Sequence, residues 1–360
     1  MGSRALFNNT TGGTLDTPFD FDVGPNTAVG TQALQSNTIT SANTAVGYQA
    51  LGSYTTGFAD SDLGANTAVG FEALGNATGG YANCGFGYRT LDANSDGYGN
   101  AAVGFNAMSS NTTGGVNTAG GYYALSNNTT GFNNTAYGEE ALLNSTGDSN
   151  TAVGSSALRS LTSGTQNTAV GASAGSNVTS ADQVICIGTN GANVSSSCFI
   201  GNIRTIVPQN NDTVPVVIDS TGQLGTLISS RRYKIDIKPM DGASESILAL
   251  KPVSFRYKVH KGAKPQFGLV AEDVAEVNPD LVIYDHDDKP LTVRYDAVNA
   301  MLLNEFLKEH KKVQQLETAV AQQRDQFEAT ITELKNEIEN VAACSENREK
   351  KSKRRMFRWN

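Results

Sequence analysis

The first 228 residues contain no lysine, no histidine and only 4 arginines, although they make up most of the 360-residue chain. Their 14 acidic residues give a net charge of −10, whereas residues 229–360 contain 23 basic and 21 acidic residues, a net of +2. The first lysine of the protein is Lys234. Without histidine or recurring paired carboxylates, the first part lacks the usual groups of an acid–base enzyme. A change of composition this abrupt predicts a boundary between two kinds of structure near residue 228.

Long apolar runs and cysteines are also scarce. No apolar segment approaches the roughly 18 residues that a membrane-spanning helix needs, and the first residues lack the apolar core of a secretory signal peptide. The 4 cysteines are too few and too scattered for a disulfide scaffold or a zinc site. We therefore expect no membrane span, no bound metal and no cofactor.

A repeat of about 17 residues runs through the first part of the chain. After the repeated motif NTAVG, most copies continue through an aromatic or small residue to Ala-Leu and then to a polar turn such as SNNTTG. One repeat is too small to bury its own apolar residues, so neighbouring repeats must stack to form a core. The motif, or a close variant, begins at Asn26, Asn43, Asn66, Asn83, Asn100, Asn117, Asn134, Asn150 and Asn167.

Each repeat has the features of a short β-strand and two turns. TAVG alternates small apolar and polar residues, as in a strand, its glycine suits a turn with positive φ, and frequent Gly, Asn and Thr argue against helices. The repeats predict an all-β segment over 26–203, either a β-solenoid or a trimeric β-roll, between a lead segment (1–25) and a β-linker (204–228). Because each turn holds few large apolar residues, a single chain should have a thin core, which favours pooling of three chains. The pattern resembles the heads of trimeric autotransporter adhesins and the repeat shafts of phage tail fibres.

Four segments of the remaining chain carry a second resemblance. SSRRYKIDIKP (229–239) is followed by LALKPVSFRYK (248–258), FGLVAEDVAEVNPDLV (267–282) and LTVRYDAVNAMLLNEFLKEH (291–310). In this order they resemble the peptidase S74 domain, the intramolecular chaperone at the C-terminus of endosialidase tail spikes and other trimeric fibres. The resemblance implies a small α+β domain that assembles as a homotrimer and cleaves itself.

Self-cleavage in that family uses a serine and a lysine five positions later, and Ser229 and Lys234 match this spacing. The resemblance implies an autoproteolytic serine peptidase that cuts once, between Ile228 and Ser229, and turns over no external substrate. A serine hydroxyl is a weak nucleophile until a base removes its proton, and a lysine amine acts as that base only when neutral, which burial favours. The apolar neighbours Ile228, Tyr233 and Ile235 make an apolar setting plausible.

Two features of this segment leave alternatives open. The family often has Asp after the serine, whereas this chain has Ser230, which lies four residues before the lysine and is a second candidate nucleophile. In an extended strand, Ser229 and Lys234 would lie on opposite faces because their spacing is odd. A bend between them, or a lysine from a neighbouring chain, would then be needed to join the two side chains.

The chaperone core is expected over 229–295. Glu272 and Asp273 are either polar partners of the cleavage site or the exposed first turn of a helix. The cluster from Asp285 to Asp288 is either part of a metal site or a solvated turn, and we favour the turn. The predicted elements are a short helix at 244–250, a strand at 253–259, a strand running into a helix over 267–277, and a hairpin over 281–295.

Apolar residues recur every seven positions between 296 and 343, which predicts a coiled-coil helix with a register shift near 323–331. The basic tail (344–360) is interpreted either as a solvated, disordered segment, which we favour, or as a contact with anionic lipid or nucleic acid. The residues of the seven-residue repeat are Phe306, Val313, Val320, Phe327, Leu334 and Val341.

These observations predict a mixed fold: an all-β repeat segment, then a small α+β chaperone domain that ends in a long coiled-coil helix. The first interpretation is a trimeric fibre, spike or adhesin-like protein of a virion tail or a cell surface, whose repeats bind a glycan or receptor and whose chaperone cleaves itself off after assembly. The alternative is a structural or ligand-binding trimer that retains an uncleaved domain. A third, a regulator freed by cleavage, would need a nucleic-acid-binding face, which the net charge of −10 argues against.

Overall fold

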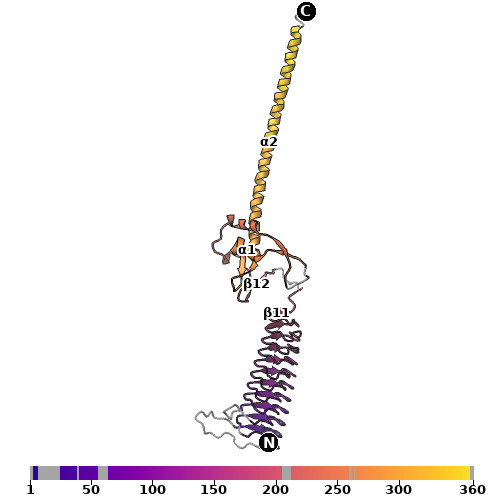
Figure 1. Cartoon of the computed structure of the whole chain (residues 1–360), viewed down its shortest axis with the longest axis vertical. Helices are drawn as coiled ribbons and strands as arrows, with labels where there is room; N and C mark the ends of the chain where they lie inside the picture. Colours follow the sequence, from indigo (N-terminus) through magenta and orange to yellow (C-terminus); the bar gives the residue numbers. More distant parts are fainter. Residues whose placement is uncertain are drawn as a thin grey trace. The chain divides into compact units, whose positions relative to one another are not determined.

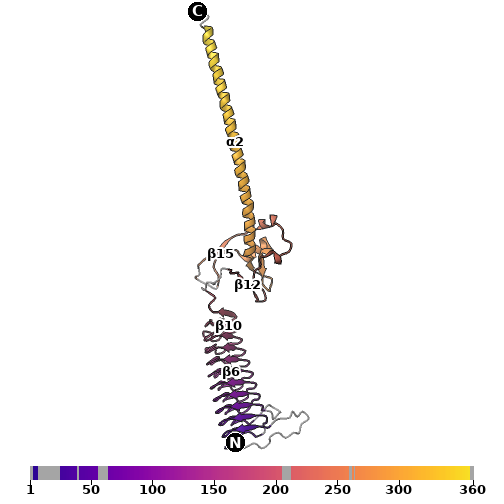
Figure 2. The ribbon, with the colours of Figure 1, turned by 180° about the vertical axis from the view of Figure 1, so that it is seen from behind.

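The computed structural model describes residues 3–6, 25–38, 40–55, 64–204, 212–258, 262 and 264–356. The chain divides into two compact units, residues 1–209 and residues 210–360. In the first unit short strands stack one above another, whereas the second contains small two-stranded sheets and a long helix (Figure 1 and Figure 2).

The first unit is a β-solenoid with one short strand per turn. Its described strands form one parallel sheet in which sequence neighbours are also spatial neighbours. Equivalent residues pair between turns, as Thr118 with Thr135 and Ala119 with Ala136. The predicted all-β repeat segment is therefore confirmed as a solenoid. Its strands are β1 (Thr27–Val29), β2 (Thr44–Val46), β3 (Thr67–Val69), β4 (Cys84–Phe86), β5 (Ala101–Val103), β6 (Thr118–Gly120), β7 (Thr135–Tyr137), β8 (Thr151–Val153), β9 (Thr168–Val170), β10 (Val184–Ile187) and β11 (Ser197–Ile200).

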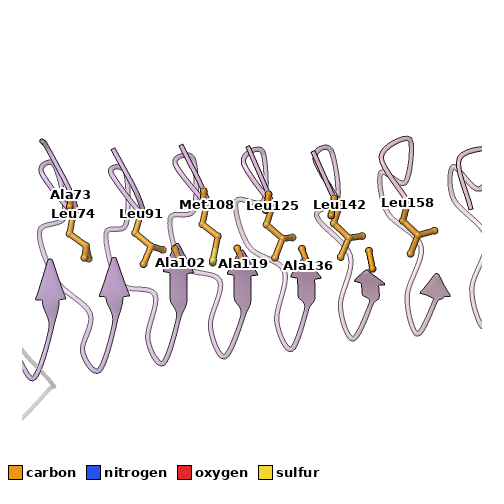
Figure 3. Packing of buried hydrophobic residues seen from close by; sticks show 14 of the residues in the cluster. Ala73, Leu74, Leu91, Ala102, Met108, Ala119, Leu125, Ala136, Leu142 and Leu158 are labelled. Carbon is orange, nitrogen blue, oxygen red and sulfur yellow. The ribbon is translucent and has the colours of Figure 1, made fainter. Parts of the chain in front are cut away.

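Small apolar side chains fill the interior of the solenoid. The middle residue of each strand from β2 to β9 faces inward and is buried, as Ala102 and Ala119 are, while Leu125 and Leu142 of the opposite wall reach toward it (Figure 3). Met108 takes the leucine position in one turn. Each turn is narrow enough for these side chains to close it. The scarcity of large apolar residues therefore does not leave a single chain without a core.

The wall opposite the sheet has an unexpected backbone conformation. Two residues per turn, such as Glu140 (φ 55°) and Leu142 (φ 52°), have left-handed backbone, which is unfavourable by about 1–2 kcal/mol for a residue other than glycine. Hydrogen bonds between turns compensate, since Glu140 N donates to Tyr122 O at 2.8 Å and Leu142 N donates to Ala157 O at 3.0 Å. The sequence predicted positive φ only at glycines.

The glycine that ends each NTAVG motif forms a column along the solenoid. Gly104 has φ 134°, and a Cβ added there would lie 2.4 Å from the carbonyl oxygen of Gly121 in the next turn. Only glycine combines this φ with such a close approach of two backbones. The predicted positive φ at this position is confirmed.

The asparagine that opens each motif is buried and forms a ladder of hydrogen bonds. Asn117 N and Nδ2 both donate to Asn100 Oδ1, at 3.0 and 3.1 Å, and Asn117 Nδ2 also donates to Gly131 O at 2.8 Å. The next turn repeats the contact, because Asn134 N donates to Asn117 Oδ1 at 2.8 Å. The asparagines at this position therefore belong to the interior of the solenoid and not to its outer surface.

Residues 3–6 extend the solenoid at its N-terminal end. Leu6 N donates to Ala33 O at 3.1 Å, Gln32 N donates to Ser3 O at 3.0 Å, and Leu6 packs against the solenoid core. This part of the predicted lead segment (1–25) therefore belongs to the stack. Residues 7–24 lie outside the described residues.

The second unit has a much smaller core. In its described part, Val274, Leu281, Val282, Val293 and Met301 form the buried cluster. The predicted short helix, the strand before a helix and the hairpin all occur at the expected places. The elements are β12 (Val216–Ile218), β13 (Leu224–Thr226), η1 (Arg231–Tyr233), η2 (Asp241–Ala249), β14 (Val253–Phe255), β15 (Gln266–Gly268), α1 (Ala271–Val277), η3 (Pro279–Leu281), β16 (Val282–Tyr284), β17 (Pro290–Val293) and α2 (Tyr295–Met356), where η marks a 3₁₀-helix.

Helix α2 confirms the predicted long helix and continues past 343 through the basic segment to Met356. The expectation of a disordered tail is therefore wrong for 344–356, where Glu, Lys and Arg are good helix formers. With 62 residues it is about 90 Å long. No described helix is long and apolar enough to cross a membrane. The side chains of its seven-residue repeat are exposed in the single chain: Phe306, Val313, Val320, Phe327, Leu334 and Val341.

Candidate functional site

The predicted cleavage segment folds as a tight turn rather than as a strand. Ser230 precedes the 3₁₀-helix η1, and its hydroxyl oxygen accepts from Arg232 N at 3.4 Å and from Arg232 Nε at 3.3 Å. The turn closes with Tyr233 N donating to Ser230 O at 3.0 Å and Lys234 N donating to Arg231 O at 3.2 Å. Residues on either side of η1 are therefore brought back toward each other.

This turn places the two predicted catalytic side chains together within one chain. Lys234 Nζ lies 3.5 Å from Ser229 Oγ, which is the outer limit of a hydrogen bond. Catalytic hydrogen bonds are often long before the reactive complex has formed. The bend that the odd spacing required is η1, so a lysine from another chain is not needed to reach Ser229.

The two neighbouring serines have different contacts. Ser230 is occupied as the cap of η1, a position that favours Ser, Thr, Asp or Asn because a short side-chain oxygen accepts from the free N–H groups of the turn. Ser229 faces the lysine amine instead. The geometry thus favours Ser229 over Ser230 as the nucleophile. Ser230 and the Asp expected from the family could fill the same role, since the side-chain oxygen of either residue caps a helix.

The surroundings of the pair are open in the single chain. Ser229 and Lys234 are exposed, and the apolar neighbours Ile228, Tyr233 and Ile235 are 56%, 62% and 88% exposed. Arg232 lies over the Tyr233 ring at 5.4 Å from its centroid. The apolar setting that would favour a neutral lysine is therefore not supplied by these side chains within one chain.

The hairpin β12–β13 leads directly into the predicted scissile bond. Its turn is held by Asp219, whose carboxylate accepts from Thr221 Oγ1 at 2.7 Å and from Gln223 N at 3.0 Å. The hydrogen bond from the Thr221 side chain and those from backbone N–H groups lower the pKa of Asp219. Both faces of the hairpin are exposed, with Val216 and Leu224 as examples.

The other polar candidates lie apart from this pair in their contacts. Glu272 and Asp273 form the exposed first turn of α1, and no hydrogen bond in the described residues joins them to the pair. Asp285 organises the turn of the β16–β17 hairpin, where its carboxylate accepts from Asp287 N at 2.9 Å and Lys289 N at 3.0 Å. In the described part of the chain no three His, Cys, Asp or Glu residues are grouped as metal ligands.

A polar cluster that sequence reasoning missed joins η2 to α2. Ser244 is buried, its hydroxyl donates to Glu305 Oε1, and it accepts from Asn304 Nδ2 at 2.6 Å. Lys308 Nζ lies 2.7 Å from Glu305 Oε1 and 3.5 Å from Ser244 Oγ. The sequence offered only the weak signal that Asn304, Glu305 and Lys308 share one face of a helix.

This second serine–lysine pair is built differently from the first. The hydrogen bond from Lys308, then that from Ser244, lowers the pKa of Glu305, while the hydrogen bond to Glu305 raises the pKa of Lys308. A lysine held in its charged form cannot take a proton from serine. The cluster is therefore a structural contact between two elements and not a second nucleophilic site.

Residues 229–283 match the family model Peptidase_S74, described as chaperone of endosialidase. The match begins at Ser229, the residue predicted to follow the scissile bond, and ends within β16. The resemblance seen in the sequence is thereby confirmed for this part of the second unit. Neither the curated proteins nor the solved structures that were compared contain a match to the chain.

Proposed function

We propose that this chain is the subunit of a trimeric fibre, spike or adhesin-like protein whose C-terminal unit drives assembly and then cuts itself off between Ile228 and Ser229. The observation that carries the proposal is the 3.5 Å contact between Lys234 Nζ and Ser229 Oγ at the start of the segment that matches the chaperone family. A virion tail or a cell surface is the proposed location, and a glycan or receptor is the proposed partner of the repeats.

The proposed reaction uses only residues of this segment. Neutral Lys234 takes the proton of Ser229 Oγ, which attacks the carbonyl carbon of Ile228. The peptide C–N bond breaks, the proton passes to the departing Ser229 nitrogen, and an ester joins Ile228 to Ser229 Oγ. Water then hydrolyses the ester and leaves a carboxylate on Ile228 and a free amine and hydroxyl on Ser229.

Assembly is proposed to activate this reaction. In the single chain Ile228, Tyr233 and Ile235 are exposed, and so is the apolar stripe of α2. Association of three α2 helices would bury that stripe. Neighbouring copies would then cover the cleavage segment, and loss of water around Lys234 would favour its neutral form. Cleavage would therefore follow correct assembly.

Intact mass spectrometry of the purified chain tests the proposal. The wild-type protein should give two pieces, residues 1–228 and 229–360, whereas Ser229→Ala and Lys234→Met should each remain a single 360-residue chain. Ser230→Asp is the matched control and should still be cut, because Asp keeps the cap of η1 but has no hydroxyl that could act as nucleophile. An uncut wild-type chain that is nevertheless trimeric would reject cleavage.

The second candidate function is a trimer that retains its chaperone unit. The exposure of Ser229 and Lys234 in the single chain favours it, since no side chain of one copy excludes water from the pair. The same masses discriminate the two functions, because this candidate predicts that full-length wild-type chain accumulates during expression and storage.

A further inference from the structure

The outer face of the solenoid sheet is formed by two columns of side chains. In each three-residue strand the middle residue points into the core, so the first and third residues point outward. Val103 and Val153 are 54% and 41% exposed. The side chains stacked in adjacent turns cover the rest of each valine. The first column is Thr27, Thr44, Thr67, Cys84, Ala101, Thr118, Thr135, Thr151, Thr168, Ile185 and Cys198, and the second is Val29, Val46, Val69, Phe86, Val103, Gly120, Tyr137, Val153, Val170, Ile187 and Ile200.

This face carries no charged residue, although the first 228 residues have a net charge of −10. The charges of the solenoid lie on its other walls, where some are paired, as Arg89 with Glu72 at 3.0 Å and Arg159 with Glu140 at 2.8 Å. Two acidic units repel each other across most of their surfaces. The two columns form a surface on which copies can approach without placing like charges together.

A ladder of aromatic rings borders the face along one edge. Tyr48, Phe71, Tyr88, Phe105 and Tyr122 follow the glycine column, and their rings stack with centroids 4.8 to 5.4 Å apart. Stacking covers the ring faces, which are the surfaces that a sugar ring would use, and leaves the ring edges outward. The ladder ends at Glu139, the residue in the equivalent position of the next turn. The apolar surface is therefore widest beside β2 to β6.

The size of the face fits an interface between proteins. Eleven strands about 4.8 Å apart, each with three residues of about 3.3 Å, give roughly 500 Å². Patches of this size lie in the upper range for monomers and usually mark interaction sites. With the aromatic border added, the surface approaches the roughly 800 Å² per partner of a standard interface.

We infer that this charge-free face, centred on β2 to β6, is where copies of the chain pack against one another. The inference rests on the proposed trimer and adds a requirement to it. Once the chaperone unit is cut away, the α2 helices no longer hold the solenoids together, so a fibre that outlasts cleavage needs its own contact between repeats. Like copies also present the same spacing between turns, which lets their columns interlock.

Cys84 is a native probe, because it is exposed on the first column of β4. The native wild-type protein would be treated with a maleimide and its labelled peptides identified by mass, with a denatured sample as the fully labelled reference. The mass of the released 1–228 piece would be measured by light scattering. We expect a trimer with Cys84 labelled at least tenfold more slowly than in a monomeric solenoid.

Two substitutions in the same turn complete the test. Val103→Glu places a charge among Phe86 and Gly120 and should give a monomeric 1–228 piece with reactive Cys84. Thr113→Glu changes an exposed turn residue away from the face and should remain trimeric with Cys84 protected. Circular dichroism would establish that both variants keep the wild-type sheet content.

The outcomes separate this inference from the proposed function. If the chain trimerises and cleaves while Cys84 reacts freely and Val103→Glu changes nothing, the face is rejected and the proposed function stands. If the chain stays uncut but Cys84 is protected and Val103→Glu exposes it, the face stands and cleavage is rejected. A monomeric wild-type chain would overturn both.

Discussion

The two units of the chain bury their apolar side chains to very different extents. In the solenoid nearly every turn buries its own Ala-Leu pair and its strand alanine, so one chain has a continuous core. In the second unit the described buried cluster has five members, while Ile235 and Phe267 are 88% and 85% exposed. A solenoid of this kind can be stable once formed, whereas the second unit leaves many apolar side chains uncovered within one chain, which fits the trimer that we propose.

The same comparison shows where the solenoid is weak. Its turns are so alike that Thr pairs with Thr and Ala with Ala at half of the steps between described strands. A slip by one whole turn would keep nearly the same pairs, so the repeats specify their register poorly. Parallel pairing between distant residues also forms slowly. The solenoid, although its core is complete, is thus the unit that benefits from a template. We propose that the second unit provides this template.

The largest expected effect comes from adding a side chain where two backbones approach each other in the glycine column. Gly104→Ala adds a Cβ 2.4 Å from Gly121 O at φ 134°, which combines a disallowed backbone angle with a steric clash. We expect a loss of about 4 kcal/mol in unfolding free energy, measured by urea unfolding of the full chain followed by tyrosine fluorescence.

The matched control is Gly188→Ala. Gly188 also has positive φ, at 60°, but a Cβ there would meet nothing within 4 Å. Alanine tolerates this left-handed angle at about 1 kcal/mol. Equal losses for the two variants would mean that the close approach between turns does not limit the choice of residue in the column.

A smaller effect is expected when the buried ladder receives a charge. Asn117→Asp keeps the shape but places a carboxyl between Asn100 and Asn134, without a basic partner in the contacts of that ladder. Burial raises the pKa of such a carboxyl above its unfolded value near 4. The variant should therefore lose about 3 kcal/mol at pH 7 and progressively less as the pH falls from the raised folded pKa toward about 4, below which the carboxyl is neutral in both states.

The exposed Asn127→Asp is the control for this pH dependence. Asn127 lies on the surface, where it donates to Asn144 Oδ1, and a carboxylate there stays solvated. We expect a change within about 0.5 kcal/mol at either pH. A pH-independent loss in Asn117→Asp would show that lost donors, and not the buried charge, are responsible.

The sequence predicted the parts of the fold that repeat. Nine spaced copies of NTAVG were enough for strands, stacking and the glycine turn, because each feature recurs at one position of the repeat. The inward direction of Asn117 could not be predicted, since asparagine is ordinarily a surface or turn residue. The left-handed Leu142 was equally hidden, because its conformation is selected by hydrogen bonds between turns and not by its own preference.

In the candidate site, too, a contact between residues close in sequence could be predicted, whereas contacts between distant residues could not. The pairing of Ser229 with Lys234 was predictable from the family resemblance and the spacing, but the turn η1 that joins them was not, because the same residues suit a strand. Ser244 was missed because its partners Asn304 and Glu305 lie about sixty residues away in the chain. Contacts of this separation leave no pattern in a single sequence.

The smallest expected effect concerns the cluster around Ser244, which links η2 to helix α2 in the second unit. Ser244→Ala removes a buried hydroxyl that donates to Glu305 and accepts from Asn304, whose remaining acceptor is Asp241 O. We therefore expect a loss of about 1–2 kcal/mol. Urea unfolding of the uncut Ser229→Ala chain, followed by helix ellipticity, would report it, since the described helices all lie in the second unit. Ser246→Ala, at a half-buried hydroxyl that meets Asn278 instead, is the comparison and should change less.

The pKa shifts of this cluster determine the direction in which its contribution to stability changes with pH. The pKa of Glu305 is lowered in the folded chain, mainly by Lys308 and then by Ser244, so its contribution is present above the unfolded pKa near 4.3 and is lost as the pH falls through the lower folded value. Lys308, whose pKa is raised by Glu305, contributes below the unfolded pKa near 10.4 and stops contributing as the pH rises through its folded value. Without Ser244 the pKa of Glu305 moves back toward its ordinary value, so acid should begin to melt the helix at a higher pH. An unchanged acid transition in Ser244→Ala would mean that Lys308 alone holds the carboxylate, and that η2 is fixed to α2 by apolar packing.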